Sequence, residues 1–360
     1  MIERSLVEAA ARLRRHGEPY VVATVVRARR PGARMILTRY RWLAGTVSGG
    51  GFEGELASSA WMHTKDAGPV VLTYDAHHPD IGGDDDLRAA FGLGDGESVD
   101  VMLERAGAPG RLDVLELAAR CSRQQKRGAA ATVIRSEGSA VKLGMRLALV
   151  AGGEIEQEQL IDSTLRDEIA TDLRVVLETG CAMTRSFGAF DVLSEAIEPP
   201  PRLFVFGSGH DLVPLAQLAR QIGWDVVICG EATRYSTRER FVMADEILTG
   251  DLDSLAERIN ESERAVCVVA THDADKDRAI LAMLGTTKAC YIGVVGSGAR
   301  HALDDHRVRE LLGDSPQDRA FAAIGESQAV LRRMPGAPTT LPERPVPSRP
   351  SAAFAAVVAL

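Results

Sequence analysis

The C-terminal half of this chain alternates between two kinds of segment, and this alternation constrains the fold more than any other feature. Continuously apolar runs predict buried strands at Leu203–Phe206, Asp225–Cys229, Val266–Thr271 and Cys290–Val295. Helical patterns are expected at Asp211–Ile222, Asp251–Asn260, Asp275–Leu284 and Ala299–Leu312. Apolar strands without polar alternation, joined by helices, are typical of parallel sheets with helices on both faces. The pattern therefore predicts a doubly wound α/β domain.

Three consecutive prolines precede this alternation. Pro199-Pro200-Pro201 can neither continue a helix nor fill a central strand, so they predict a linker. We expect an N-terminal domain over residues 1–198 and the doubly wound domain over residues 202–313. Residues 314–360 are predicted to form a proline-rich tail, because six of the sixteen prolines lie between Pro335 and Pro350.

The N-terminal domain contains a degenerate repeat. A helix starting near Ser5 is followed by a predicted strand at Val21–Arg27, and a helix starting near Asp113 is followed by one at Ala130–Arg135. We therefore predict two α/β half-modules, about 1–107 and 108–198. Features shared by both copies are expected to serve the fold, and features found in one copy are candidates for function.

A glycine-rich loop over residues 45–53 occurs in the first copy only. Its candidate binding residues are Gly49, Gly50, Gly51 and Glu53, whereas the second copy has only Gly152-Gly153-Glu154 at the matching place. Backbone N–H groups of such a loop can surround an anion or a flat ligand. An alternative role for Glu53 is at the start of the next helix, where the helix dipole favours a carboxylate.

A second glycine turn follows the first strand of the doubly wound domain. Its candidate residues are Gly207, Ser208, Gly209 and His210, and unpaired N–H groups at the following helix start suit a phosphate. The pattern departs from the dinucleotide fingerprint, because Leu212 holds the third glycine position and Gly230 stands where a ribose-binding acid is expected. Glu231 follows one residue late. These departures favour a phosphate-bearing ligand over nicotinamide, the alternative being a turn that merely needs glycine.

Further polar residues follow the later strands of the same predicted sheet. His272 and Asp273 end one strand, and Gly296 and Ser297 end the next. The carboxyl ends of parallel strands meet at one edge, where ligands bind in open α/β sheets. We therefore expect these residues at one binding edge with Gly207 and Glu231, although Asp273 could equally serve as a helix cap.

Composition excludes several classes of function. A formal charge of −8, from 42 basic and 50 acidic side chains, opposes binding to nucleic acid. No apolar run reaches the ~18–20 residues of a membrane span, and the N-terminus lacks the layout of a signal peptide. Five scattered cysteines without a C-x-x-C pair predict core thiols in a cytoplasmic protein. His77, His78, Asp80 and Asp84–Asp86 lack the spacing of a metal loop, so no metal site is expected.

Seven short motifs, taken in order, resemble those of the XdhC/CoxI family, the xanthine dehydrogenase accessory factors. They are Ala23–Arg27, Pro31–Met35, Gly45–Glu53, Phe206–His210, Thr237–Phe241, Thr271–Asp273 and Tyr291–Ser297. The resemblance covers about residues 5 to 313. It implies an N-terminal accessory-factor domain followed by a Rossmann-like domain.

The resemblance also implies a function. Family members bind molybdenum cofactor, as molybdopterin or its dinucleotide form, as cargo and help to install it in a xanthine-dehydrogenase-like or CO-dehydrogenase-like molybdenum hydroxylase. The implied protein is a homodimeric cytoplasmic chaperone rather than a turnover enzyme, with a sulfur-donating desulfurase as a further possible partner. We expect the turn at Gly207–Asp211 to hold the phosphate and the Gly45–Glu53 loop to cover the pterin from the other domain.

Two positions depart from the family pattern. Gly51 and Asp95 stand where the family usually has cysteine, so sulfur transfer or thiolate contact with molybdenum at those positions is in doubt. This divergence leaves two alternatives open. One is an oxidoreductase that uses NAD(P), and the other is a scaffold that has lost its ligand.

Overall fold

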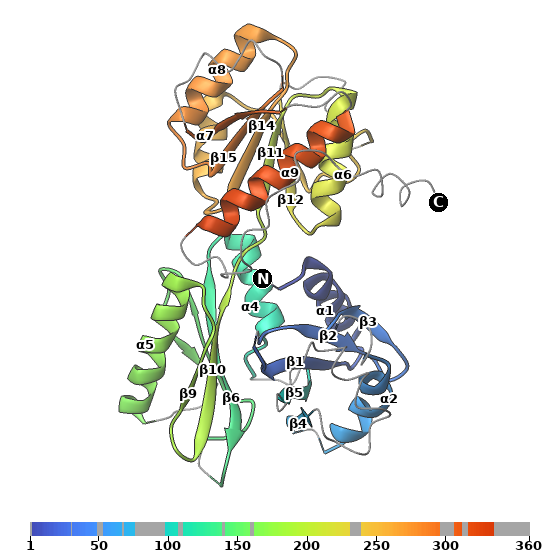
Figure 1. Cartoon of the computed structure of the whole chain (residues 1–360), viewed down its shortest axis with the longest axis vertical. Helices are drawn as coiled ribbons and strands as arrows, with labels where there is room; N and C mark the ends of the chain where they lie inside the picture. Colours follow the sequence, from blue (N-terminus) through green and yellow to red (C-terminus); the bar gives the residue numbers. More distant parts are fainter. Residues whose placement is uncertain are drawn as a thin grey trace.

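The computed structural model describes residues 2–29, 31–48, 53–66, 68–75, 98–106, 111–138, 141–158, 162–230, 239–295, 306–311 and 316–334. Three sheets lie within these residues (Figure 1). Two sheets of five strands build the N-terminal part, and a six-stranded sheet builds the C-terminal domain. The expected α/β class is confirmed.

The two N-terminal sheets have the same strand order, which confirms the repeat. The first half-module comprises α1 (Arg4–His16), β1 (Val21–Arg27), β2 (Arg34–Leu37), β3 (Trp42–Gly45), α2 (Glu53–His63), β4 (Val70–Asp75) and β5 (Ser98–Arg105). The second comprises α4 (Val114–Gln124), β6 (Gly128–Ser136), β7 (Arg146–Val150), β8 (Glu156–Gln157), α5 (Ser163–Thr179), β9 (Met183–Ser186) and β10 (Phe190–Ile197). Their orders are β3-β2-β1-β5-β4 and β8-β7-β6-β10-β9.

The half-modules contact each other through equivalent residues. Val26 and Met102 of the first pack against Ile134 and Leu193 of the second in one apolar cluster. Each of these pairs comes from corresponding strands, β1 with β6 and β5 with β10. The domain is therefore built like an internal dimer, in which the same surface is used twice.

The C-terminal domain is a parallel sheet with helices on both faces, as predicted. Its strands are β11 (Arg202–Phe206), β12 (Asp225–Cys229), β13 (Glu246–Leu248), β14 (Ala265–Val269), β15 (Tyr291–Val294) and β16 (Val308–Glu310), in the order β13-β12-β11-β14-β15-β16. A short turn η1 (His210–Leu212) leads into α6 (Val213–Gln221), and the other helices are α7 (Leu252–Asn260), α8 (Ala274–Gly285) and α9 (Pro316–Arg333). Residues of α6 and α9 pack on one face of the sheet, and residues of α7 and α8 on the other.

Two sequence predictions for this domain are corrected. A helix is expected from the pattern over Ala299–Leu312, but residues 308–310 form β16, where Val308 pairs with Ile292 of β15. The proline-rich tail is expected to start at 314, but α9 packs Ala320, Ala323 and Leu331 into the core of the sheet. These residues have helical spacing, but the prolines that follow residue 334 led to the prediction of an extended tail for the whole segment.

Candidate functional site

A cavity of about 610 Å³ opens at the carboxyl ends of β11, β12 and β14. Its walls are apolar where Phe206, Leu252, Leu255 and Ile280 line it. Its polar lining consists of Ser208, Asp251, Thr271, Asp273 and Lys276. The volume is in the range of small-molecule sites, and the position beside the switch between β11 and β14 is where doubly wound sheets bind ligands.

Gly207 is required by the backbone at this edge. Its φ is +138°, and a Cβ there would overlap the carbonyl oxygen of Ala270, which follows β14. The N–H of Gly207 donates to the Cys229 carbonyl at 3.2 Å, which ties the turn to β12. Gly207 therefore brings the chain close to both neighbouring strands.

The next three residues present unbonded backbone donors. In the part of the chain that the structure describes, the N–H groups of Ser208, Gly209 and His210 donate no hydrogen bond. Successive free N–H groups of this kind form an anion-binding concavity. The turn therefore has the donors for an anion, and the phosphate expected from the sequence stays a prediction.

A carboxylate and an imidazole lie against this turn. The Asp211 side chain folds over Gly209, and His272 Nε2 is 3.3 Å from Asp211 Oδ1. His272 has a left-handed backbone, with φ of 62°. The pair lies beside the free N–H groups, but neither residue lines the cavity.

Asp273 and Asp251 are helix caps as well as cavity residues. Asp273 Oδ1 accepts hydrogen bonds from the N–H groups of Asp275 and Lys276 at 3.1 and 3.2 Å. Asp273 therefore caps α8, which was the alternative role predicted for it. Asp251 Oδ1 accepts the Ser254 N–H at 2.8 Å at the start of α7. The sequence analysis did not predict Asp251 as a site residue. The preceding strand, β13, has only three half-buried residues, so no apolar run in the sequence indicates a strand there.

The Glu53 carboxylate accepts hydrogen bonds from residues of its own loop. The side chain is buried and accepts hydrogen bonds from the Thr46 hydroxyl, from Val47 N at 3.0 Å and from Ser48 N at 2.9 Å. Burial alone raises the pKa of Glu53, but these hydrogen bonds outweigh it and lower the pKa to about 2. Glu53 is thus an anchor of the loop, while Gly49, Gly50, Gly51, Glu231, Gly296 and Ser297 lie outside the described residues.

The contacts between domains contradict the expected cover over the ligand. Arg4 of α1 donates to Asp225, the first residue of β12, at 2.6 Å. Arg264, just before β14, donates to Glu198 at 2.8 Å. The amino ends of the strands thus face the N-terminal domain (Figure 1), and the cavity lies at the opposite edge, ~16 Å along a five-residue strand. The described ends of the expected covering loop, Gly45–Ser48 and Glu53, therefore belong to the domain at the edge opposite this cavity.

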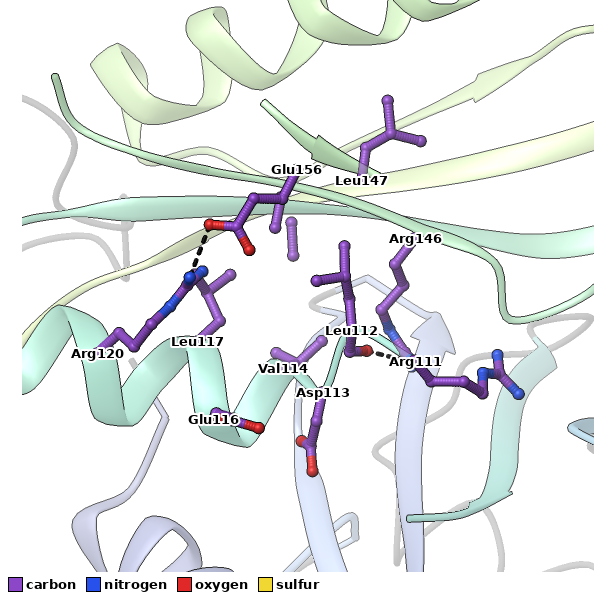
Figure 2. A pocket seen from close by; sticks show the side chains of 12 residues that line it. Arg111, Leu112, Asp113, Val114, Glu116, Leu117, Arg120, Arg146, Leu147 and Glu156 are labelled. Atoms are coloured by element: carbon purple, nitrogen blue, oxygen red, sulfur yellow. Dashed lines mark hydrogen bonds and ion pairs between the residues drawn. The ribbon is translucent and has the colours of Figure 1, made fainter. Parts of the chain in front are cut away.

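A second, smaller cavity of about 170 Å³ lies within the second half-module, between α4 and the strands β6, β7 and β8 (Figure 2). Its charged residues pair with one another or with their neighbours. Arg120 contacts Glu156 at 2.6 Å, and Arg146 donates to the Leu112 carbonyl at 3.2 Å and to Glu104 at 2.9 Å. This pairing gives the cavity a structural role.

The cysteines do not supply a reactive thiolate to the large cavity. Cys229 lines it, but burial raises the pKa of that thiol well above its usual range. The expectation of core thiols is correct for Cys121, Cys229 and Cys267, and wrong for Cys181, which is exposed. No group of three or more potential metal ligands occurs among the residues described, and His77–Asp86 lie outside them. Within the same ranges, no helix is long and apolar enough to cross a membrane.

Comparison with known proteins identifies the family. The XdhC Rossmann domain matches residues 203–329, and the XdhC and CoxI family matches residues 13–75. A probable xanthine dehydrogenase subunit from Bacillus subtilis is 28% identical over 313 residues, which cover 86% of this chain and 87% of that protein. The crystal structure of a xanthine dehydrogenase from Bacillus halodurans shares the fold, with a TM-score of 0.69 and 20% identity over 91% of this chain and 96% of that one. The chain belongs to the XdhC and CoxI family.

Proposed function

We propose that this protein carries molybdenum cofactor in its Rossmann domain and helps to insert it into a xanthine-dehydrogenase-like molybdenum hydroxylase. The family and the named relative support an accessory role in xanthine dehydrogenase maturation. The observation that carries the proposal is the row of free N–H groups at Ser208, Gly209 and His210 beside a cavity of about 610 Å³.

The residues at this edge fit a phosphorylated pterin. The cofactor supplies a phosphate, which the free N–H groups would hold, and a flat ring system, which the apolar walls would accept. The Asp211 carboxylate beside the turn repels an anion, and His272 offsets this repulsion when it is protonated. Gly207 allows the turn to lie directly against the end of β14, because a side chain there would overlap the Ala270 backbone.

The chemistry of the cavity supports carriage rather than sulfur transfer. Cys229 lines the cavity as a buried thiol with a raised pKa, so it is a poor nucleophile at neutral pH. Sulfuration by a separate desulfurase, a homodimeric state and a cytoplasmic location remain predictions from the family resemblance.

A second candidate is an oxidoreductase that uses NAD(P). The strand order β13-β12-β11-β14-β15-β16 favours it, because dinucleotide-binding domains have the same order. Gly230 opposes it, since no acid occupies that position at the end of β12.

Native mass spectrometry of the full chain tests the proposal. The protein is purified from cells grown with and without molybdate, and its bound mass is measured. A molybdopterin-containing mass that gains molybdenum only with molybdate supports the proposal. A bound nicotinamide dinucleotide supports the oxidoreductase, and a ligand-free protein from both cultures supports the scaffold.

A further inference from the structure

We propose that Asp251 makes this cavity selective for a heterocycle with an amino group beside a ring N–H, as in guanine and pterins. The inference rests on the proposed function, which places the phosphate at the glycine turn. It adds the position of the other end of the ligand, the amino edge of its ring. It concerns one carboxylate that the family resemblance did not single out.

The first support is an unused acceptor. Asp251 Oδ1 caps α7 through the Ser254 N–H at 2.8 Å. The Asp251 side chain is exposed at the rim of the cavity that it lines, and no hydrogen bond within the described ranges uses Oδ2, which leaves that oxygen accessible to a ligand. Hydrogen bonds from Ser254 lower the pKa of Asp251, so the group is an anionic acceptor at neutral pH.

The second support is the surroundings of that carboxylate. Leu252 and Leu255 of α7 and Ile280 of α8 line the same cavity and provide apolar contact for a flat ring. A ring inserted between them loses water from its polar edge, so each N–H on that edge needs a partner inside the cavity. Guanine and pterins present two adjacent donors, whereas the corresponding edge of adenine has a donor beside an acceptor. A carboxylate can accept hydrogen bonds from both donors of guanine or a pterin, but it repels the ring acceptor of adenine.

The third support is the span of the site. Asp251 follows β13, and the free N–H groups at Ser208–His210 follow β11, two strands away in the sheet. Adjacent strands are about 4.8 Å apart, which puts the two places about 10 Å apart across the edge. A phosphate joined to a bicyclic ring by a short linker spans such a distance. The phosphate end therefore lies at the glycine turn, and the amino edge of the ring lies at Asp251.

Asp273 provides an internal control. It also lines the cavity and also caps a helix, but it follows β14, on the opposite side of β11 from Asp251. Asn is as good an N-cap as Asp, so Asp251→Asn and Asp273→Asn both preserve their helices. Only the first change removes the proposed acceptor for the amino edge.

The test measures binding of GMP, IMP and AMP by isothermal titration calorimetry to ligand-free full-length protein. GMP and IMP differ only in the 2-amino group that Asp251 would bind. We expect GMP to bind about tenfold or more tightly than IMP, with AMP weaker still. We expect Asp251→Asn to remove the preference for GMP over IMP, and Asp273→Asn to retain it.

The outcomes separate this inference from the proposed function. Equal affinity for GMP and IMP, an unchanged preference in Asp251→Asn, or no nucleotide binding at all overturns the inference, even when molybdopterin co-purifies with the protein. A preference that depends on Asp251, in a protein that never retains a pterin, upholds the inference and overturns the proposed function.

Discussion

Arg34 of β2 forms a buried ion pair with Glu195 of β10, and this pair joins the two half-modules. The equivalent residues of the repeat, Arg146 of β7 and Glu104 of β5, form the reciprocal pair. Arg34 and Arg146 each lie two residues after a glycine with positive φ, Gly32 and Gly144. The N-terminal domain is thus held together by one charged contact used twice.

Breaking one of these pairs is expected to destabilise the domain strongly. Glu195→Gln leaves the Arg34 guanidinium buried without a counter-charge, so the free energy of unfolding should fall by about 3 kcal/mol in urea denaturation. Glu104→Gln should lower it by a similar amount, because the environment of Glu104 is equivalent. The half-exposed pair of Arg120 and Glu156 is the control, and Glu156→Gln should cost less than about 1 kcal/mol. A cost for Glu195→Gln as small as that of the control would contradict this account.

Gly207→Ala is expected to destabilise the Rossmann domain. The new methyl group would overlap the Ala270 carbonyl oxygen, and the backbone would be held at φ of +138°, so we expect a loss of about 3 kcal/mol in thermal or chemical denaturation. Gly17→Ala is the matched control, because Gly17 also has a positive φ but faces open space. It should cost about 1 kcal/mol. Equal losses in the two variants would show that close approach to β14 is unimportant.

The acid stability of the first half-module is expected to depend on Glu53. Its pKa falls from 4.5 to about 2 on folding, so it stabilises the folded state above pH 4.5, and this stability is lost as the pH falls towards 2. Urea denaturation at several pH values should show that Glu53→Gln lowers stability by about 2 kcal/mol at pH 7 and that the difference from wild type narrows on acidification. Glu55→Gln should have the opposite sign, because burial raises the pKa of Glu55: removing this charge should not lower stability at pH 7. A difference independent of pH would refute this role.

Arg4 is expected to hold the two domains together. Its guanidinium donates to Asp225 and Asp245 and to the Trp224 carbonyl, so Arg4→Ala removes the cation that joins α1 to these two carboxylates of the Rossmann domain. Arg220 still lies 3.8 Å from Asp245 in that variant. We expect faster proteolysis at the linker Pro199–Pro201 and a larger radius of gyration in small-angle X-ray scattering. Arg12→Ala, a change on the same helix, should leave both unaltered. A compact, resistant Arg4→Ala protein would assign the interface to other contacts.

Local patterns predicted much of the fold and part of the site. The matched segments Thr24–Arg27 and Thr132–Arg135 indicate the repeat, because both have the same order of polar and apolar positions. The free N–H groups at Ser208–His210 followed from a glycine turn between a strand and a helix. The position of α9 was missed because its apolar residues precede a proline-rich stretch that suggested a tail.

Contacts between distant segments were beyond the reach of these patterns. Nothing near Arg4 indicates that it binds Asp225 and turns the amino ends of the strands towards the N-terminal domain. The sequence around Glu53 fits a ligand residue and a loop anchor equally well, and the hydrogen bonds from Thr46 and Ser48 identify the anchor. Asp251 was not predicted as a site residue, because β13 has only three half-buried residues and is too short to be recognised as a strand in the sequence.

The most direct test of the central claim is the pterin content of wild-type protein and of Gly209→Val, purified from molybdate-supplied cells and measured by fluorescence after oxidation. A valine at 209 would crowd Asp211 and His272 at the mouth of the phosphate turn, and circular dichroism should show that the variant remains folded. The account predicts about one pterin per wild-type chain and almost none in the folded variant. Equal pterin in both proteins, or none in the wild type, would contradict it.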